Sequence, residues 1–222
     1  HREIRYPSKK LLTIPNAVNV NKFSFSESGR ASIRDELNLL ESHNLIGMIG
    51  RYDPQKNQAG FIEAASIVHK SYPNTYFFIA GRGIDLNNKD LTELIATLKL
   101  EKNIYLLGER DDVNSLLSAA DIFALPSYGE AFPISLCEAM SCSVPCIATD
   151  VGDVRHILGN YKHIISPGNT NELVSSISEI ISLDAQERKD IGFELRERIT
   201  QNFTIEAITK IYTNFYNQIY HA

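Results

Sequence analysis

Two glutamates that flank a proline form the most suggestive chemical pattern in the sequence. Glu130 and Glu138 stand eight positions apart in the stretch YGEAFPISLCE. Pro133 is expected to open a helix over 133–142, because proline fits the first helical turn, where its missing N–H costs little. Glu138 would lie about a turn and a half into that helix, roughly 8 Å along its axis from Pro133. The carboxylates are then too far apart to share a proton, and they suit the two ends of an elongated ligand.

The tip of this helix is expected to bind anions, because unpaired backbone N–H groups and the helix dipole favour phosphate there. The N–H groups available for phosphate or sugar oxygens are those of Ala131, Phe132 and Ile134. The alternative for Glu138 is a solvated helix residue. Its neighbours include Leu136, Cys137 and Met140, and an idle carboxylate would be costly to bury among them.

Two cations follow an apolar run earlier in the chain. Arg51 and Lys56 lie in the stretch GRYDPQKN, directly after the run at 45–49. A guanidinium offers a planar fork and an ammonium a point charge, so together they can bind a diphosphate. Charge-assisted bonds contribute about 1.5–3 kcal/mol each, which outweighs weak long-range repulsion from a net charge of −5. A solvated turn closed by Pro54 is the alternative interpretation.

Two weaker patterns accompany these groups. Gly81 and Gly83 would let a ligand approach the backbone closely, although a plain turn explains them equally well. Asp111 and Asp112 resemble a pair of metal ligands, but a helix N-cap with a first-turn acid is the favoured interpretation. No Asp-x-Asp motif lies near the loops described above, and no metal site is predicted.

Short apolar runs alternate with segments of helical period after residue 38. The runs lie at 45–49, 75–80, 103–107, 121–125, 144–148 and 162–165, and the helical segments at 57–70, 89–98, 111–119 and 170–183. The runs lack polar alternation, so they fit strands covered on both faces and joined by right-handed helical crossovers. The predicted fold is α/β: a doubly wound, six-stranded parallel sheet of Rossmann-like form, with C-terminal helices over 185–222. Ligands bind at the carboxyl ends of such strands.

Composition narrows the function classes. Lys plus Arg number 22 against 27 for Asp plus Glu, and no basic run exists to track a nucleic acid. No apolar run reaches the length of a membrane span, and no signal peptide is recognisable, so a soluble protein is expected. The three cysteines lie in or beside apolar segments and are predicted to be buried thiols in a reducing cytoplasm.

With these residues in view, the chain resembles the C-terminal, donor-binding half of a retaining glycosyltransferase of the GT-B fold, of the group 1 type also called family 4. The resemblance covers roughly residues 11–222, with 1–10 as a leader. Its strongest parts are the two glutamates with seven residues between them, and Arg51 with Lys56. Further support comes from IPNAVN at 14–19, GRG at 81–83 and ADIFALPS at 120–127.

The resemblance implies a role for each member of this constellation. Arg51 and Lys56 would hold the donor diphosphate, Glu138 the ribose hydroxyls, and Glu130, as the catalytic residue, the transferred sugar. The base would rest near the loop that contains Arg110. Further contacts to the donor would come from Gly81, Ala131, Phe132 and Ile134.

Two departures from the family pattern matter. Ala17 and Asn19 replace a usual Gly and Asp near the start of the resemblance. A usual Gly-Gly and Glu pattern is absent from the stretch GDVRH, and no role is assigned to residues 153–156.

The implied activity is transfer of a sugar from a nucleotide diphosphate sugar to an acceptor hydroxyl, in surface polysaccharide or glycolipid synthesis, with no further cofactor. The acceptor, a sugar or lipid-linked sugar, would bind through an N-terminal domain that this sequence lacks, so the fragment alone is expected to be inactive. A cytoplasmic location is expected, and the missing half could bring the protein to the inner face of the membrane. The last segment, 205–220, carries one broad apolar face that fits contact with that half.

Two alternatives stay open at this point. A nucleotide-sugar epimerase of related fold would need its own acid and base. A non-catalytic nucleotide-sugar-binding module would keep Arg51 and Lys56 but would have no need of Glu130. A dinucleotide oxidoreductase is disfavoured, because no Gly-x-Gly-x-x-Gly follows any apolar run. The base, the sugar and the acceptor are not specified by the sequence.

Overall fold

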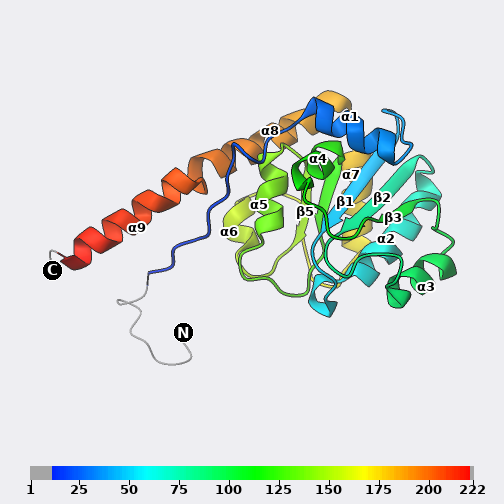
Figure 1. Cartoon of the computed structure of the whole chain (residues 1–222), viewed down its shortest axis with the longest axis horizontal. Helices are drawn as coiled ribbons and strands as arrows, with labels where there is room; N and C mark the ends of the chain where they lie inside the picture. Colours follow the sequence, from blue (N-terminus) through cyan, green and yellow to red (C-terminus); the bar gives the residue numbers. More distant parts are fainter. Residues whose placement is uncertain (1–11, 221–222) are drawn as a thin grey trace.

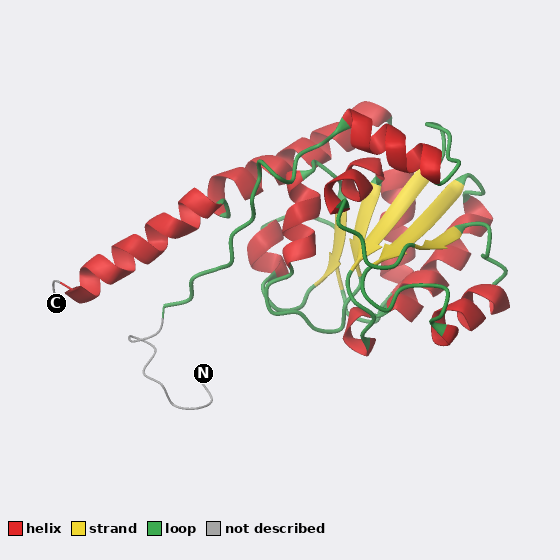
Figure 2. Ribbon diagram, in the orientation of Figure 1, coloured by secondary structure: helices red, strands yellow, loops and turns green. Residues whose placement is uncertain are grey.

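The computed structural model describes residues 12–220, so the leader interpreted at 1–10 lies outside the described residues. Its centre is a six-stranded sheet, parallel throughout, with the strand order β3-β2-β1-β4-β5-β6 (Figures 1 and 2). The strands are β1 (Asn44–Ile49), β2 (Thr75–Ala80), β3 (Ile104–Leu106), β4 (Ile122–Leu125), β5 (Cys146–Thr149) and β6 (Ile164–Ile165). The predicted fold class is confirmed.

Helices cover both faces of the sheet (Figure 2). One face carries α1 (Glu27–Glu36), α4 (Val113–Ala119), α5 (Ile134–Ser141), α6 (Val154–Leu158) and α8 (Ala185–Asn202). The other face carries α2 (Gln58–Ser71), α3 (Lys89–Thr97) and α7 (Thr170–Ser182). Successive side chains of a strand enter opposite cores: on β1, Leu45 packs in the first and Ile46 in the second. Burial on both sides explains the unbroken apolar runs of the sequence.

The switch in strand order lies between β1 and β4. The chain leaves β1 toward β2 and β3 on one side, then returns to place β4 on the other side of β1. Loops that follow β1 and β4 therefore diverge at the carboxyl edge and leave a crevice there, which is where open α/β sheets bind ligands. These two loops are the ones that carry Arg51, Lys56 and Glu130.

Two helices lie where the sequence analysis placed none. α6 is only five residues long, and α1 is polar except at a narrow buried strip of Gly29, Ile33 and Arg34. Arg34 is 2% exposed and forms an ion pair of 3.3 Å with Asp121, at the amino end of β4. A helix whose buried contact is an ion pair has no strong apolar periodicity to reveal it.

The C-terminal helix α9 (Ile205–Tyr220) extends away from the sheet (Figure 1). Of its residues only Ile208 is buried, while Tyr212, Tyr216 and Ile219 are exposed. A bridge between Val18 and Thr204 ties the N-terminal segment to the start of this helix. The apolar face predicted for 205–220 is thus present, and residues 12–220 leave most of it uncovered.

The three cysteines are free and fully buried, as predicted. Burial raises the pKa of the Cys137 and Cys142 thiols to about 12, so both stay protonated at neutral pH. No helix within residues 12–220 combines the length and the apolar content that crossing a bilayer requires.

Candidate functional site

The loop after β1 folds through its own side chains. Asp53 accepts a hydrogen bond from the Gln55 N–H at 2.9 Å and so caps the 3₁₀ turn η2 (Pro54–Lys56). The Arg51 guanidinium donates to the same carboxylate at 2.7 Å, and its side chain is 60% exposed. An exposed ion pair of this kind is weak, so Arg51 can exchange Asp53 for a stronger anion.

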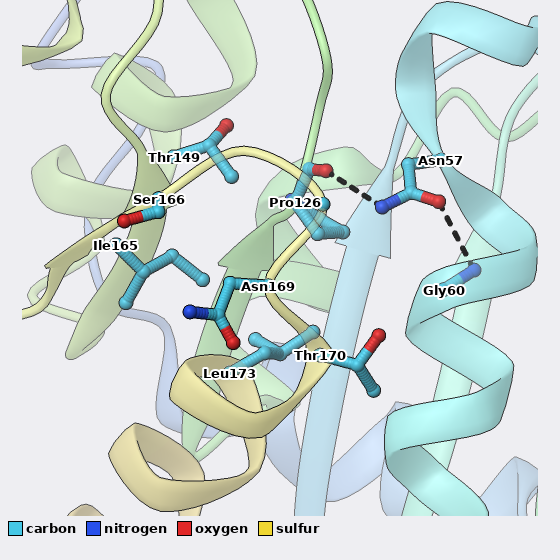
Figure 3. A pocket seen from close by; sticks show the side chains of 10 residues that line it. Asn57, Gly60, Pro126, Thr149, Ile165, Ser166, Asn169, Thr170 and Leu173 are labelled. Carbon is cyan, nitrogen blue, oxygen red and sulfur yellow. Dashed lines mark hydrogen bonds between the residues drawn. The ribbon is translucent and has the colours of Figure 1, made fainter.

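Three consecutive residues tie this loop to the loop after β4. Asn57 donates from Nδ2 to the Pro126 carbonyl at 3.1 Å, and the Gln55 carbonyl accepts from the Tyr128 N–H at 2.7 Å. Asn57 has a left-handed backbone and also caps α2 by accepting from the Gly60 N–H, as Figure 3 shows. The small cavity beside it, about 10 Å³, is too small for more than a water-sized molecule.

The third link between the two loops is an ion pair. The Lys56 ammonium lies 2.7 Å from Oε1 of Glu130. The same oxygen accepts from the Ser127 hydroxyl at 2.8 Å, and the Glu130 side chain is only 8% exposed. Lys56 and Glu130 are thus brought together across the switch point, which the sequence analysis did not predict.

The helix tip expected at Pro133 is present with a shift of one residue. Pro133 occupies the N-cap position and α5 begins at Ile134, because the ring fixes a φ of −73° while ψ stays extended at 101°. Among the described residues nothing accepts from the N–H groups of Ala131, Phe132 and Ile134. Phe132 packs against Phe203 with ring centroids 5.9 Å apart, whereas Ala131 and Ile134 are exposed. The tip is therefore open and its donors are unpaired.

Glu138 lies in the second turn of α5 and is partly buried. No hydrogen bond or ion pair of its carboxylate occurs within residues 12–220. Burial raises its pKa to about 7, and the positive charge of Lys22 opposes the rise. A carboxylate held in this way gains from any ligand that donates hydrogen bonds to it.

The loop after β5 supports the loop that carries Glu130. Gly152 has a φ of +53°, and a Cβ there would come within 2.1 Å of the Glu130 carbonyl oxygen. The neighbouring Asp153 N–H donates to the Ala131 carbonyl at 2.9 Å. No role was assigned to 153–156 from the sequence. The glycine alone hinted at this close backbone contact, since no larger residue fits it.

A pocket of about 410 Å³ lies at the carboxyl ends of β1, β2 and β3. Its lining includes Arg51, Gly81, Arg82, Glu109 and Arg110. Thus Arg51 and two further residues predicted to bind the donor, Gly81 and Arg110, share one hollow. Its size is within the range of small-molecule sites.

Two details of this pocket concern residues singled out in the sequence. The Gly81 N–H donates to the Gly108 carbonyl at 2.7 Å, so that amide is engaged within the protein. What Gly81 supplies is space, because a Cβ there would meet the Gly50 carbonyl oxygen at 2.2 Å. Asp112 stands at the N-cap of α4 but makes no capping bond, because its carboxylate accepts from Arg110 at 2.8 Å.

Arg110 is held firmly in place. Its guanidinium also pairs with Glu36 of α1 at 2.7 Å, so two carboxylates fix its plane. Arg82, which was assigned no role from the sequence, lines the same pocket, and its guanidinium makes no hydrogen bond or ion pair in the described part of the chain. The described residues contain no cluster of three or more His, Cys, Asp or Glu side chains able to hold a metal ion.

Known structures of the same fold resemble this chain over nearly its whole length. The Anabaena protein HepE in complex with UDP and glucose matches with a TM-score of 0.86 and 23% identity, covering 98% of this chain and 59% of that one. The C-terminal domain of a group 1 family glycosyl transferase (LpcC) from Francisella tularensis matches with a TM-score of 0.73 and 26% identity, covering 85% and 99%. The second match is to a separate domain of similar extent.

Proteins of similar sequence also match this chain over part of their own length. The chain is 32% identical over 162 residues to a UDP-Gal:alpha-D-GlcNAc-diphosphoundecaprenol alpha-1,3-galactosyltransferase from Escherichia coli, covering 72% of this chain and 41% of the relative. It is 24% identical over 220 residues to an N-acetyl-alpha-D-glucosaminyl L-malate synthase from Bacillus anthracis, covering 98% and 56%. The chain thus spans about half the length of these relatives. The model of the family described as glycosyl transferases group 1 matches residues 29–203, and the chain belongs to that family.

Proposed function

We propose that this chain is the donor-binding half of a retaining glycosyltransferase that takes a UDP-sugar. Membership of the group 1 family supports transfer of a sugar. UDP is named in the E. coli galactosyltransferase relative and in the HepE complexes, which favours UDP over other nucleotides. The substrate is therefore a diphosphate flanked by a nucleoside on one side and a sugar on the other.

The geometry of the site matches the parts of such a donor. The pocket beside Arg51 and Arg110 would take the base, and the partly buried Glu138 would accept hydrogen bonds from the ribose hydroxyls. Arg51, Lys56 and the unpaired N–H groups at the tip of α5 would bind the diphosphate. Glu130 would face the transferred sugar.

The chemistry follows from where charge develops. The bond between the anomeric carbon and the diphosphate oxygen breaks, so negative charge grows on the leaving diphosphate and positive charge on the sugar ring. Lys56, Arg51 and the α5 tip stabilise the first charge, and the Glu130 carboxylate orients sugar hydroxyls beside the second. The acceptor oxygen forms the new bond to the anomeric carbon, and its proton passes to the oxygen of the leaving diphosphate.

One observation carries this proposal. The Lys56 ammonium and the Glu130 carboxylate meet at 2.7 Å beside an open helix tip, so a cation for phosphate adjoins an acceptor for hydroxyls. A diphosphate bound by Lys56 places the attached sugar within reach of Glu130.

Binding of the acceptor substrate is proposed for the whole protein, of which this chain is one part. A sugar or lipid-linked sugar of surface polysaccharide or glycolipid synthesis would bind to a second domain, which we place against the exposed apolar face of α9. The work of such an enzyme would be cytoplasmic, at the inner face of the membrane where lipid-linked acceptors are found. The chain alone is expected to bind donor without transferring it.

Calorimetric titration tests the donor assignment. The chain is titrated with UDP, GDP and ADP, and then with their sugars. UDP should bind with the highest affinity of the three nucleotides, and absence of UDP binding would contradict the proposal. In the full-length protein, Glu130→Gln should abolish transfer and leave UDP affinity nearly unchanged. Full transfer by that variant would contradict a catalytic role for Glu130.

A further inference from the structure

Ser127 is a fully buried serine in the loop after β4, three residues before Glu130. Its hydroxyl donates to Oε1 of Glu130 at 2.8 Å. The Lys56 ammonium lies 2.7 Å from that same oxygen. Both protein donors of the Glu130 carboxylate therefore meet on one oxygen atom, and within residues 12–220 Oε2 accepts from none.

Ser127 is itself fixed by its neighbours. Its carbonyl accepts from the Thr149 hydroxyl at 2.6 Å, at the end of the adjacent strand β5. The preceding carbonyl, that of Pro126, accepts from Asn57 at 3.1 Å. The backbone at 126–127 is thus held from both sides, by the loop after β1 and by β5. With its backbone held and its side chain buried, Ser127 keeps its hydroxyl within hydrogen-bond distance of Oε1 of Glu130.

The two donors to Oε1 differ in mobility. Lys56 is an ammonium on a four-carbon stem and is 21% exposed, so an arriving diphosphate competes for it. Ser127 has a short side chain, is buried and stays where it is. When the ammonium turns toward a phosphate, the serine bond keeps the nearly buried carboxylate from losing every protein partner.

We propose that Ser127 is a positioning residue that holds Oε1 of Glu130, so that Oε2 faces the transferred sugar of the donor. This role rests on the proposed function, because it needs a sugar at Glu130. It acts on the sugar part of the ligand and leaves the nucleotide part alone, since Ser127 is not among the residues that line the pocket for the base.

The test compares affinities for UDP and for a UDP-sugar. The chain is titrated calorimetrically with UDP, UDP-galactose, UDP-glucose and UDP-N-acetylglucosamine, and the sugar that the wild type binds most tightly is kept. Ser127→Ala should reduce the ratio of UDP-sugar affinity to UDP affinity about tenfold, with UDP affinity within about twofold of wild type. Ser127→Cys, which keeps the shape with a weaker donor, should fall between the two.

Ser141→Ala is the matched control. Ser141 is also fully buried, and its hydroxyl donates to the Cys137 carbonyl at 2.7 Å within α5. The substitution removes the same atom and one hydrogen bond without touching Glu130. Its affinity ratio should equal that of the wild type.

A double-variant cycle sharpens the test. If Ser127 acts through Glu130, then Ser127→Ala added to Glu130→Gln should change the ratio by less than about twofold. An unchanged ratio in Ser127→Ala, or equal losses for UDP and UDP-sugar, would overturn the positioning role while leaving the proposed function intact. A wild-type chain that binds neither ligand would overturn both. If the alanine variant does not fold, the cysteine variant decides, because its side-chain volume fills the site.

Discussion

The two glutamates of the opening pattern occupy opposite kinds of surroundings. Glu130 lies in the loop after β4, where Lys56 and Ser127 both bind one of its oxygens. Glu138 lies in the second turn of α5, partly buried, and has no hydrogen-bond or ion-pair partner in the described part of the chain. The protein supplies donors to the Glu130 carboxylate, whereas the Glu138 carboxylate accepts from no donor within residues 12–220.

This difference suggests separate tasks on the proposed function: Glu130 orients the sugar, and Glu138 binds the nucleotide. A carboxylate with fixed donors keeps one geometry before any ligand arrives, which suits a group that must face a reacting sugar. Partial burial raises the pKa of Glu138 to about 7, because its charged form loses solvation and no donor within residues 12–220 replaces the lost water. On the proposed function, the ribose hydroxyls supply the missing donors. Part of the binding energy for the nucleotide then comes from relief of this burial.

Loss of Lys56 should have the largest effect, because it removes a diphosphate cation and the cation of Glu130 together. Lys56→Ala should lower UDP affinity about 100-fold, as expected for a charge-assisted contact. It should also lower the free energy of unfolding by about 2–3 kcal/mol, since the Glu130 carboxylate would remain buried without its counter-ion. Calorimetric titration and urea unfolding measure the two quantities.

The double variant Lys56→Ala/Glu130→Gln should recover most of the lost stability, because a neutral amide needs no cation. Lys162→Ala is the control: Lys162 is 56% exposed, pairs with Glu179, and should contribute less than about 0.5 kcal/mol. Equal stability losses for the two lysine variants would show that the Glu130 pair is no more than a surface contact.

Removal of the charge on Glu138 should alter the pH dependence of stability. Its pKa in the folded chain, about 7, lies above the ordinary value of 4.5, so the folded state binds more protons between these values. The free energy of unfolding should therefore fall as pH rises through this window, by about 2 kcal/mol from this group. Glu138→Gln should lack this decline when urea unfolding is followed at about pH 5 and pH 8.

Glu179→Gln provides a contrast of opposite sign. The Glu179 carboxylate is exposed, and its hydrogen bond from Lys162 lowers its pKa. Any stability that it contributes is therefore present above the ordinary pKa of glutamate and is lost as pH falls. If the free energy of unfolding changed with pH by the same slope in the wild type and in Glu138→Gln, the raised pKa of Glu138 would be contradicted.

Ionisation of the Glu138 carboxylate should also make the affinity for UDP depend on pH. Hydroxyl donors bind an ionised carboxylate better than a protonated one, so UDP affinity should rise as pH increases from about 6 to 8. Glu138→Gln should bind UDP about tenfold more weakly at pH 8 and show a smaller change with pH than the wild type, because only the terminal phosphate of UDP then titrates at the site. Calorimetry in two buffers of different ionisation enthalpy should give a different number of protons exchanged on binding in the wild type and in Glu138→Gln.

The close backbone contact between Gly152 and Glu130 can be disrupted without changing any charge. Gly152→Ala should destabilise the chain by about 2–3 kcal/mol, because its φ is positive and the new Cβ would collide with the Glu130 carbonyl. Gly108→Ala is the matched control, since it has a φ of +67° with nothing within 4 Å of a Cβ. It isolates the backbone cost, about 1 kcal/mol. Thermal unfolding of the two variants measures the difference, and equal losses would contradict a close contact at Gly152.

Arg51 should show the smallest effect on stability. Arg51→Ala removes an exposed pair with Asp53, so the free energy of unfolding should change by less than about 0.5 kcal/mol. UDP affinity should fall about tenfold, because one phosphate contact is lost. Arg155→Ala, which removes a similarly exposed pair with Asp150, should leave UDP affinity unchanged. A comparable loss in both variants would mean that Arg51 acts only through the overall charge.

Much of the fold followed from local patterns. Each predicted strand is present, because a strand covered on both faces must be apolar along its length and so stands out in the sequence. α1 did not stand out, since its buried strip holds an arginine paired with Asp121 of a distant segment. The residues that we propose for donor binding were singled out by their type and by their position after strands. The contacts that these residues make could not be predicted, because such contacts join loops far apart in the chain.

The sequence by itself determined an α/β sheet and the two loops that carry cations and carboxylates, because apolar periodicity and turn chemistry are local properties. It also carried the motifs by which the chain resembles its family. Only the tertiary structure decided that Lys56 meets Glu130, 74 residues away, and that Ser127 shares its oxygen. It alone decided that Gly152 supports this loop, and that Glu138 accepts from no donor within residues 12–220. Strand order sets these contacts: β1 and β4 become neighbours through a crossover, and their loops meet only when the sheet is assembled.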